Sequence, residues 1–71
     1  MPKLSNISAG KMIKIAVCFG FTVVRQKGSH IILKKQNRIL VIPNHKKLKI
    51  GTAFQIIKII GISKEEFEKL R

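Results

Sequence analysis

Two histidines, His30 and His45, are the residues of this sequence best suited to acid–base chemistry. Histidine is the side chain that ordinarily gains and loses a proton between about pH 5 and 8. All three carboxylates lie close to the C-terminus, at Glu65, Glu66 and Glu68. Paired-carboxylate hydrolysis and two-metal phosphoryl transfer both need acidic groups, and residues 1–64 contain none. Acid–base catalysis is therefore expected to depend on the histidines, or on a lysine crowded by other cations.

His30 is the stronger candidate because of its neighbours in the sequence. It follows Gly28 and Ser29, a pair that permits a tight turn and lets the backbone come close to a ligand. Four cations flank this turn, namely Arg25, Lys27, Lys34 and Lys35. The turn therefore combines a proton-exchanging group with positive charge. The alternative is that His30 is a half-buried residue at a strand end, hydrogen-bonded to the backbone.

His45 lies in a second basic segment, residues 44–50 (NHKKLKI). Its simpler interpretation is that it orders the loop or contacts a phosphate. Lys46, Lys47 and Lys49 come just before a predicted helix, whose first turn offers unpaired backbone N–H groups and the positive end of the helix dipole. The segment predicts a phosphate-binding loop, and a solvated run of lysines is an equal alternative.

The net charge of the chain favours a polyanionic ligand. Fifteen Lys and Arg against three Asp and Glu give the 71 residues a formal net charge of +12. Because neutralising nucleic-acid phosphates releases counterions, a nucleic acid is the first expectation. An acidic protein or an anionic membrane surface would explain the charge less specifically. Trp and Tyr are absent and the four Phe are expected in the core, so recognition of backbone and shape is favoured over base stacking.

The remaining residue types limit cofactors and location. Cys18 is the only cysteine, which argues against a disulfide, a Cys-rich zinc site and a redox pair. No metal ion and no other cofactor is expected. Residues 1–12 have no apolar signal region, and the apolar runs 39–42 and 59–62 are too short to span a bilayer. A cytoplasmic protein that does not bind membranes is expected.

The elements that must position these residues begin with a helix over residues 9–19, capped by Ser8 and stopped at Gly20. Its apolar face is expected to comprise Met12, Ile13, Ala16, Val17 and Phe19. Three short strands follow, over residues 21–27, 30–35 and 38–42. The turns between them are Gly28–Ser29 and Gln36–Asn37, and Pro43 ends the last strand.

A second helix is predicted over residues 53–60, capped by Gly51 and Thr52 and stopped at Gly61. It is apolar nearly all round, through Phe54, Ile56, Ile57, Ile59 and Ile60, and is expected at the centre of the core. An S-x-x-E capping box at residues 63–66 opens a last helical turn with Phe67 and Leu70 as its apolar pair. The fold predicted is a single α+β domain over residues 1–71, in the order α-β-β-β-α, with helices on one face of a three-stranded antiparallel sheet.

Three strings of this sequence resemble the HicA (YcfA-like) family of bacterial toxins: GFTVVRQKGSHII, IPNH and KIGTAFQIIKIIGISKEEF. The resemblance extends from about Ser8 to Phe67. It implies a fold similar to double-stranded-RNA-binding domains and the activity of a ribosome-independent mRNA interferase, held inactive by a HicB antitoxin. The family's G-S-H histidine is regarded as catalytic and corresponds to His30. A second P-x-H element matches Pro43 and His45, whose role the resemblance leaves open.

The mechanism we favour is attack of the RNA 2′-hydroxyl on the adjacent phosphate, with His30 as general base or acid and nearby Lys or Arg stabilising the developing charge. The resemblance does not identify the second acid–base group. Two other functions stay open. One is an RNA-binding module without catalysis, and the other is an interaction domain whose charge serves an acidic partner.

Overall fold

The computed structural model describes residues 7–70 of the chain. The described residues form α1 (Ala9–Cys18), β1 (Thr22–Lys27), β2 (His30–Lys35), β3 (Arg38–Pro43), α2 (Ile50–Ile60) and α3 (Lys64–Leu70). The predicted α+β fold and its order of elements are confirmed. None of the helices in this part of the chain is long and apolar enough to cross a membrane.

Helix α1 begins at Ala9 as predicted and ends at Cys18, one residue earlier than predicted. The Ser8 hydroxyl accepts a hydrogen bond from the Lys11 backbone N–H at 3.2 Å, and Gly20 follows the helix at φ +97°. Phe19 is the C-cap and not the last helical residue. The buried stripe is Ala9, Met12, Ile15 and Ala16. The stripe therefore lies closer to Ile15 than predicted, which leaves Val17 exposed.

The three strands form an antiparallel sheet in chain order, β1-β2-β3. Ile31 and Leu33 on β2 pair with Ile42 and Leu40 on β3, and all four are buried. Since side chains alternate between the faces of a strand, Ile32 and its partner Val41 lie on the outer face. Every residue of the edge strand β1 is exposed, and a bulge interrupts its ladder with β2 between Val23 and Arg25.

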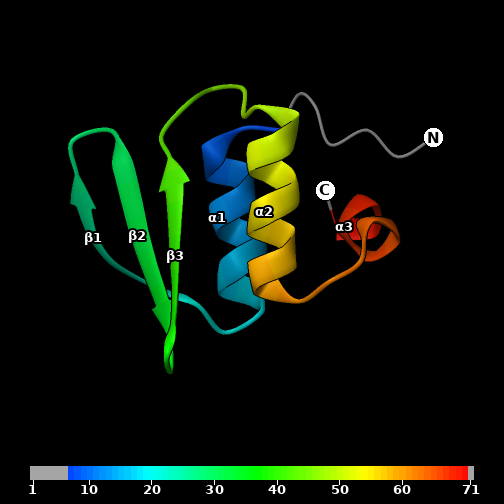
Figure 1. Cartoon of the computed structure of the whole chain (residues 1–71), viewed down its shortest axis with the longest axis horizontal. Helices are drawn as coiled ribbons and strands as arrows, with labels where there is room; N and C mark the ends of the chain where they lie inside the picture. The colour runs from blue at the N-terminus through cyan, green and yellow to red at the C-terminus, as the bar shows by residue number, and fades with distance from the viewer. Residues whose placement is uncertain (1–6, 71) are drawn as a thin grey trace.

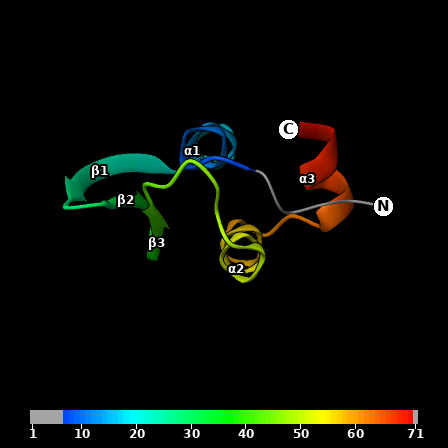
Figure 2. The ribbon, with the colours of Figure 1, turned by 90° about the horizontal axis from the view of Figure 1, so that it is seen from above.

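Helices α1 and α2 cover the inner face of the sheet. Both contact β3, and α1 also contacts β1. Figures 1 and 2 show the two helices beside β3, with α3 on the side of the helix pair away from the sheet. Buried residues of both helices, Phe21 and the inner face of the sheet make one continuous core.

Helix α2 departs from its prediction in two respects. It begins at Ile50, so Gly51 and Thr52 lie in its first turn and Lys49 is the N-cap, without a side-chain cap. Its buried residues are Ala53, Ile56, Ile57 and Ile60. Phe54 and Ile59 were expected in the core but are exposed, because one helix presents only part of its circumference to the sheet and α1.

The capping box of α3 is confirmed. The Glu66 backbone N–H donates to the Ser63 hydroxyl at 3.1 Å, and the Ser63 N–H donates to the Glu66 carboxylate at 3.4 Å. Phe67 is fully buried and anchors the helix to the core, whereas Leu70 is exposed. Of the predicted apolar pair, only Phe67 therefore packs inside.

Candidate active site

The turn between β1 and β2 sets the position of His30. Gly28 has φ +60°, which favours glycine, and the Gln26 side-chain amide donates to the Gly28 carbonyl at 3.2 Å. His30 is the first residue of β2 and pairs with Lys27 on β1 and with Pro43 on β3. The imidazole thus belongs to an exposed residue on the central strand, with a neighbour on each side.

The segment that carries His45 is fixed to the same turn by backbone hydrogen bonds. The Asn44 N–H donates to the Ser29 carbonyl at 2.6 Å, and the His45 N–H donates to the Pro43 carbonyl at 2.9 Å. The His45 carbonyl in turn accepts the Ala9 N–H, at the start of α1, at 3.0 Å. Both histidines therefore lie at one end of the sheet, and both are exposed.

Three of the four cations predicted around the turn share the outer face of the sheet with His30. Lys27 pairs directly with His30, and Arg25 pairs with Ile32, the next outward residue of β2. Lys34 lies on the same face, four residues and about 13 Å along the strand from His30. None of these three side chains is hydrogen-bonded or ion-paired to any residue that the structure describes. Their charge is therefore available to an external anion.

Lys35 is not part of this cluster. Alternation turns it to the inner face, where it is half-buried and its ammonium donates to the Phe19 carbonyl, the C-cap of α1, at 2.7 Å. Arg38, its cross-strand partner, donates to the Ile59 carbonyl in the last turn of α2 at 3.1 Å. Both cations therefore donate hydrogen bonds to carbonyl groups at helix C-termini. Lys35 lies about 17 Å along β2 from His30.

The lysines of the second basic segment surround the start of α2. Lys46 and Lys47 are exposed in the loop, and Lys49 is the N-cap of the helix. Neither α1 nor α2 has an acidic residue in its first turn. Figure 1 shows both helices starting at the end of the molecule where the β1–β2 turn lies. We call this end, with the turn and residues 44–49, the helix N-terminal end; two helix dipoles make it electropositive.

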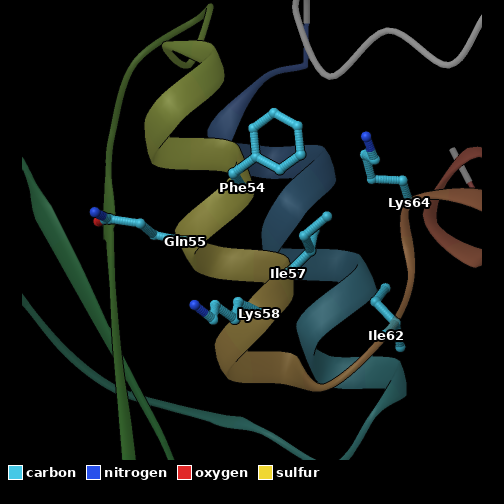
Figure 3. Close-up of a pocket in the computed structure, with 6 residues that line it drawn as sticks. All are labelled: Phe54, Gln55, Ile57, Lys58, Ile62 and Lys64. Carbon is cyan, nitrogen blue, oxygen red and sulfur yellow. The ribbon is translucent and has the colours of Figure 1, made fainter.

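Two surface hollows lie away from the histidines. One, of about 390 Å³, is formed by α2 and the segment leading into α3 (Figure 3), and a second, of about 230 Å³, lies between α1 and Leu70. Neither includes His30 or His45. Both histidines are exposed, which suits contact with a polymer better than enclosure of a small molecule. Within residues 7–70, no three His, Cys, Asp or Glu side chains are grouped so that they could hold a metal ion.

Two positioning contacts escaped the sequence analysis. The side-chain amide of Gln26 donates a hydrogen bond to the Gly28 carbonyl within the turn. No local sequence pattern predicts this role for a glutamine. The bond from Asn44 to Ser29 joins segments that are distant in sequence, so only the tertiary structure reveals it. The I-P-N-H string marks residues 42–45 as a segment of interest, but it does not predict the hydrogen bond to Ser29.

A comparison with protein families adds one match. The family model described as "HicA toxin of bacterial toxin-antitoxin" matches residues 9–62, from the start of α1 to just beyond α2. No curated protein matches the chain. The matched stretch contains the sheet, both histidines and both basic segments.

Proposed function

Because the chain belongs to the HicA toxin family of bacterial toxin–antitoxin systems, we propose that it is a ribosome-independent endoribonuclease that cleaves mRNA, with His30 as its acid–base residue. The observation that carries the proposal is the placement of His30. It is exposed on the central strand beside Lys27, at the end of the molecule where two helices begin. A phosphodiester lying across this face would meet an imidazole and several uncommitted cations together.

The reaction proposed is an intramolecular transesterification, in which a 2′-hydroxyl of the RNA is the nucleophile. The 2′-hydroxyl oxygen bonds to the adjacent phosphorus, and His30 accepts the hydroxyl proton. The bond from phosphorus to the leaving oxygen then breaks, and that oxygen takes up a proton. The products are a cyclic phosphate on one fragment and a free hydroxyl on the other. Lys27 and Arg25 stabilise the charge that develops on the phosphorus-bound oxygens.

His45 is the candidate for the second proton transfer. The acidic side chains lie at residues 65–68, beyond the matched region, and His45 is the second histidine of the chain. The bond from Asn44 to Ser29 ties the His45 segment to the turn before His30. We propose an auxiliary role for His45, protonating the leaving oxygen.

RNA binding is proposed to be electrostatic and weakly sequence-specific. The cations assigned to it are Arg25, Lys27, Lys34, Lys46, Lys47 and Lys49; Lys35, used inside the fold, is left out. The Gly28–Ser29 turn lets the RNA backbone approach, since apart from the two neighbouring residues no atom lies within 4 Å of the position a Cβ on Gly28 would take. Since mRNA is the substrate, we place the activity in the cytoplasm.

The partner proposed is a HicB-like antitoxin. Family membership implies an antitoxin partner, and a net charge of +12 favours an acidic one. Such a protein would silence the enzyme by covering the face around His30. A nuclease of this kind needs inhibition because free toxin would degrade the messages of its own cell.

The substitution His30→Ala tests the proposal. We expect cleavage of purified RNA to fall at least about 10²-fold, as for loss of a general acid–base residue. Unfolding free energy should change by less than about 1 kcal/mol because the side chain is exposed, and RNA binding should persist. His45→Ala serves as the comparison, with a smaller loss expected. A folded His30→Ala protein that cuts RNA at the wild-type rate would leave RNA binding, or cleavage centred on His45, as the remaining explanation.

A further inference from the structure

One side of α2 exposes two large apolar side chains. Ile50 is 53% exposed and Phe54 40%, and the two lie one turn apart on the same side of the helix. A helix that packs on a core through one stripe normally carries polar residues on its opposite side. Exposed apolar clusters of this kind mark interaction sites in soluble proteins, and aromatic residues are enriched at protein interfaces.

This face borders the larger of the two hollows, which we call the α2 groove. Its lining residues are Phe54, Gln55, Ile57, Lys58, Ile62 and Lys64. Figure 3 shows Phe54 and Ile57 on α2, on the side that faces Ile62, in the segment before α3, and Lys64, at the start of α3. At about 390 Å³ the groove is large enough to admit a side chain of another molecule.

The charge of the groove has one sign. Its charged lining residues are both lysines, and the Lys64 ammonium lies 5.1 Å from the centre of the Phe54 ring. This cation–π contact holds the ammonium beside the apolar surface. The nearby Glu66 carboxylate is engaged with Ser63 in the capping box. A ligand that fits must therefore pair apolar side chains with negative charge.

We propose that the α2 groove binds an acidic, amphipathic segment of the partner antitoxin. An apolar side chain of that segment would enter between Phe54 and Ile62, and its carboxylates would pair with Lys58 and Lys64. The proposal rests on the proposed function only for the existence of that partner. Because the groove contains no residue of the candidate active site, it would hold the antitoxin without depending on contacts at His30.

Two other occupants fit less well. A second copy of this chain would bring another net charge of +12 to a basic groove, and repulsion opposes that association. RNA would gain little from the apolar walls, since its phosphates bind exposed cations and the sequence offers no Trp or Tyr for base stacking. The helix N-terminal end presents the surface that RNA prefers.

Binding of the antitoxin to two groove variants tests the proposal. Phe54→Asp and Lys64→Glu are made in a His30→Ala background so that cells tolerate the toxin. The probe is the small protein encoded by the reading frame adjacent to this one, and its affinity is measured by calorimetry without RNA. We expect each variant to bind at least about tenfold more weakly than its background. RNA affinity, measured separately, should change less than about twofold with Phe54→Asp.

Val17→Asp and Lys14→Glu are the matched controls, since they make the same changes on α1 outside the groove. Unchanged affinity in both groove variants would overturn the proposal. So would a loss of RNA binding with Phe54→Asp, which would make RNA the occupant. A dimer of the background protein in size-exclusion chromatography that Phe54→Asp dissociates would make a second copy the occupant and also overturn the proposal. Thermal melts identify any misfolded variant, and Lys64→Glu, at an exposed position, keeps the test decisive. If the background protein does not bind the antitoxin, the proposed partner is wrong as well. If the background protein and both groove variants bind it with equal affinity, the partner is right and only the proposed groove is wrong.

Discussion

Cations lie at both ends of the sheet, but they meet different partners. At the β2–β3 turn, Lys35 and Arg38 each donate to a carbonyl at the end of a helix, Phe19 for α1 and Ile59 for α2. At the helix N-terminal end, the side chains of Lys27 and of the lysines in residues 44–49 have no hydrogen-bond or ion-pair partner among the described residues. We call the end of the sheet with the β2–β3 turn the helix C-terminal end, because the last residues of α1 and α2 lie there.

This difference follows from the direction of the helices. A helix C-terminus presents carbonyl oxygens and partial negative charge, so a nearby lysine finds a partner inside the fold. A helix N-terminus presents N–H groups and partial positive charge. A lysine there finds no hydrogen-bond acceptor at the helix end, and its ammonium stays available to an external anion. The same residue type therefore stabilises the fold at one end and is left for a ligand at the other.

Reversing charge at the helix N-terminal end should have the largest effect. We expect Lys46→Glu with Lys47→Glu to weaken RNA binding about tenfold or more, and to reduce the slope of log affinity against log salt by about two units. Filter binding at several salt concentrations measures both. The control is Lys14→Glu with Lys58→Glu, which changes net charge equally but in the middle of α1 and the last turn of α2. An equal loss in the control pair would mean that only total charge matters.

Removing the ammonium at the helix C-terminal end should affect stability instead. Lys35→Met keeps the apolar stem but deprives the Phe19 carbonyl of its donor. We expect the unfolding free energy to fall by about 1–3 kcal/mol, as for a lost hydrogen bond to a charged group. Denaturant titration measures the change.

Lys34→Met is the matched control for that variant, since Lys34 neighbours Lys35 but lies exposed on the outer face. Its unfolding free energy should stay within about 0.5 kcal/mol of wild type, while its RNA affinity falls. If Lys35→Met lowers RNA affinity as much as Lys34→Met does, the two ends are not functionally distinct.

The smallest expected effect is that of a chelator. Magnesium in nucleases is held largely by carboxylates. The strands, their turns and residues 44–49 contain no Asp or Glu. Cleavage of RNA by the purified protein should therefore continue at an unchanged rate in EDTA. Loss of cleavage in EDTA, with recovery on adding Mg²⁺, would mean that a bound cation does the work assigned to the histidines.

Local sequence signals predicted the elements well because their causes are local. Ser8, the Gly28–Ser29 turn and the Ser63 capping box each act within a few residues, and each lies where expected. The start of α2 was misplaced because Gly51 and Thr52 are typical caps, yet the helix begins with Ile50. Hydrophobicity alone could not show that Phe54 faces outward, since exposure depends on where the other elements pack.

The candidate site was predictable as a set of residues but not as an arrangement. Lys34 and Lys35 are neighbours in sequence and looked equivalent, yet strand alternation sends them to opposite faces. The bond from Asn44 to Ser29, which joins the two histidine segments, is a tertiary contact with no local signal. Whether His30 and His45 act as proposed stays a prediction.

The chain-order sheet has a consequence for timing. Each strand pairs with the one before it through a two-residue turn, so forming the sheet closes only short loops, at little entropic cost. Small mixed α/β domains fold within about a second, whereas ribosomes add only about 5–20 residues per second and so need several seconds for a chain of this length. This chain is therefore expected to reach its final form almost as soon as its last residue is released. An inhibitor would have to be waiting at that moment, because one translated later would meet a toxin that is already folded.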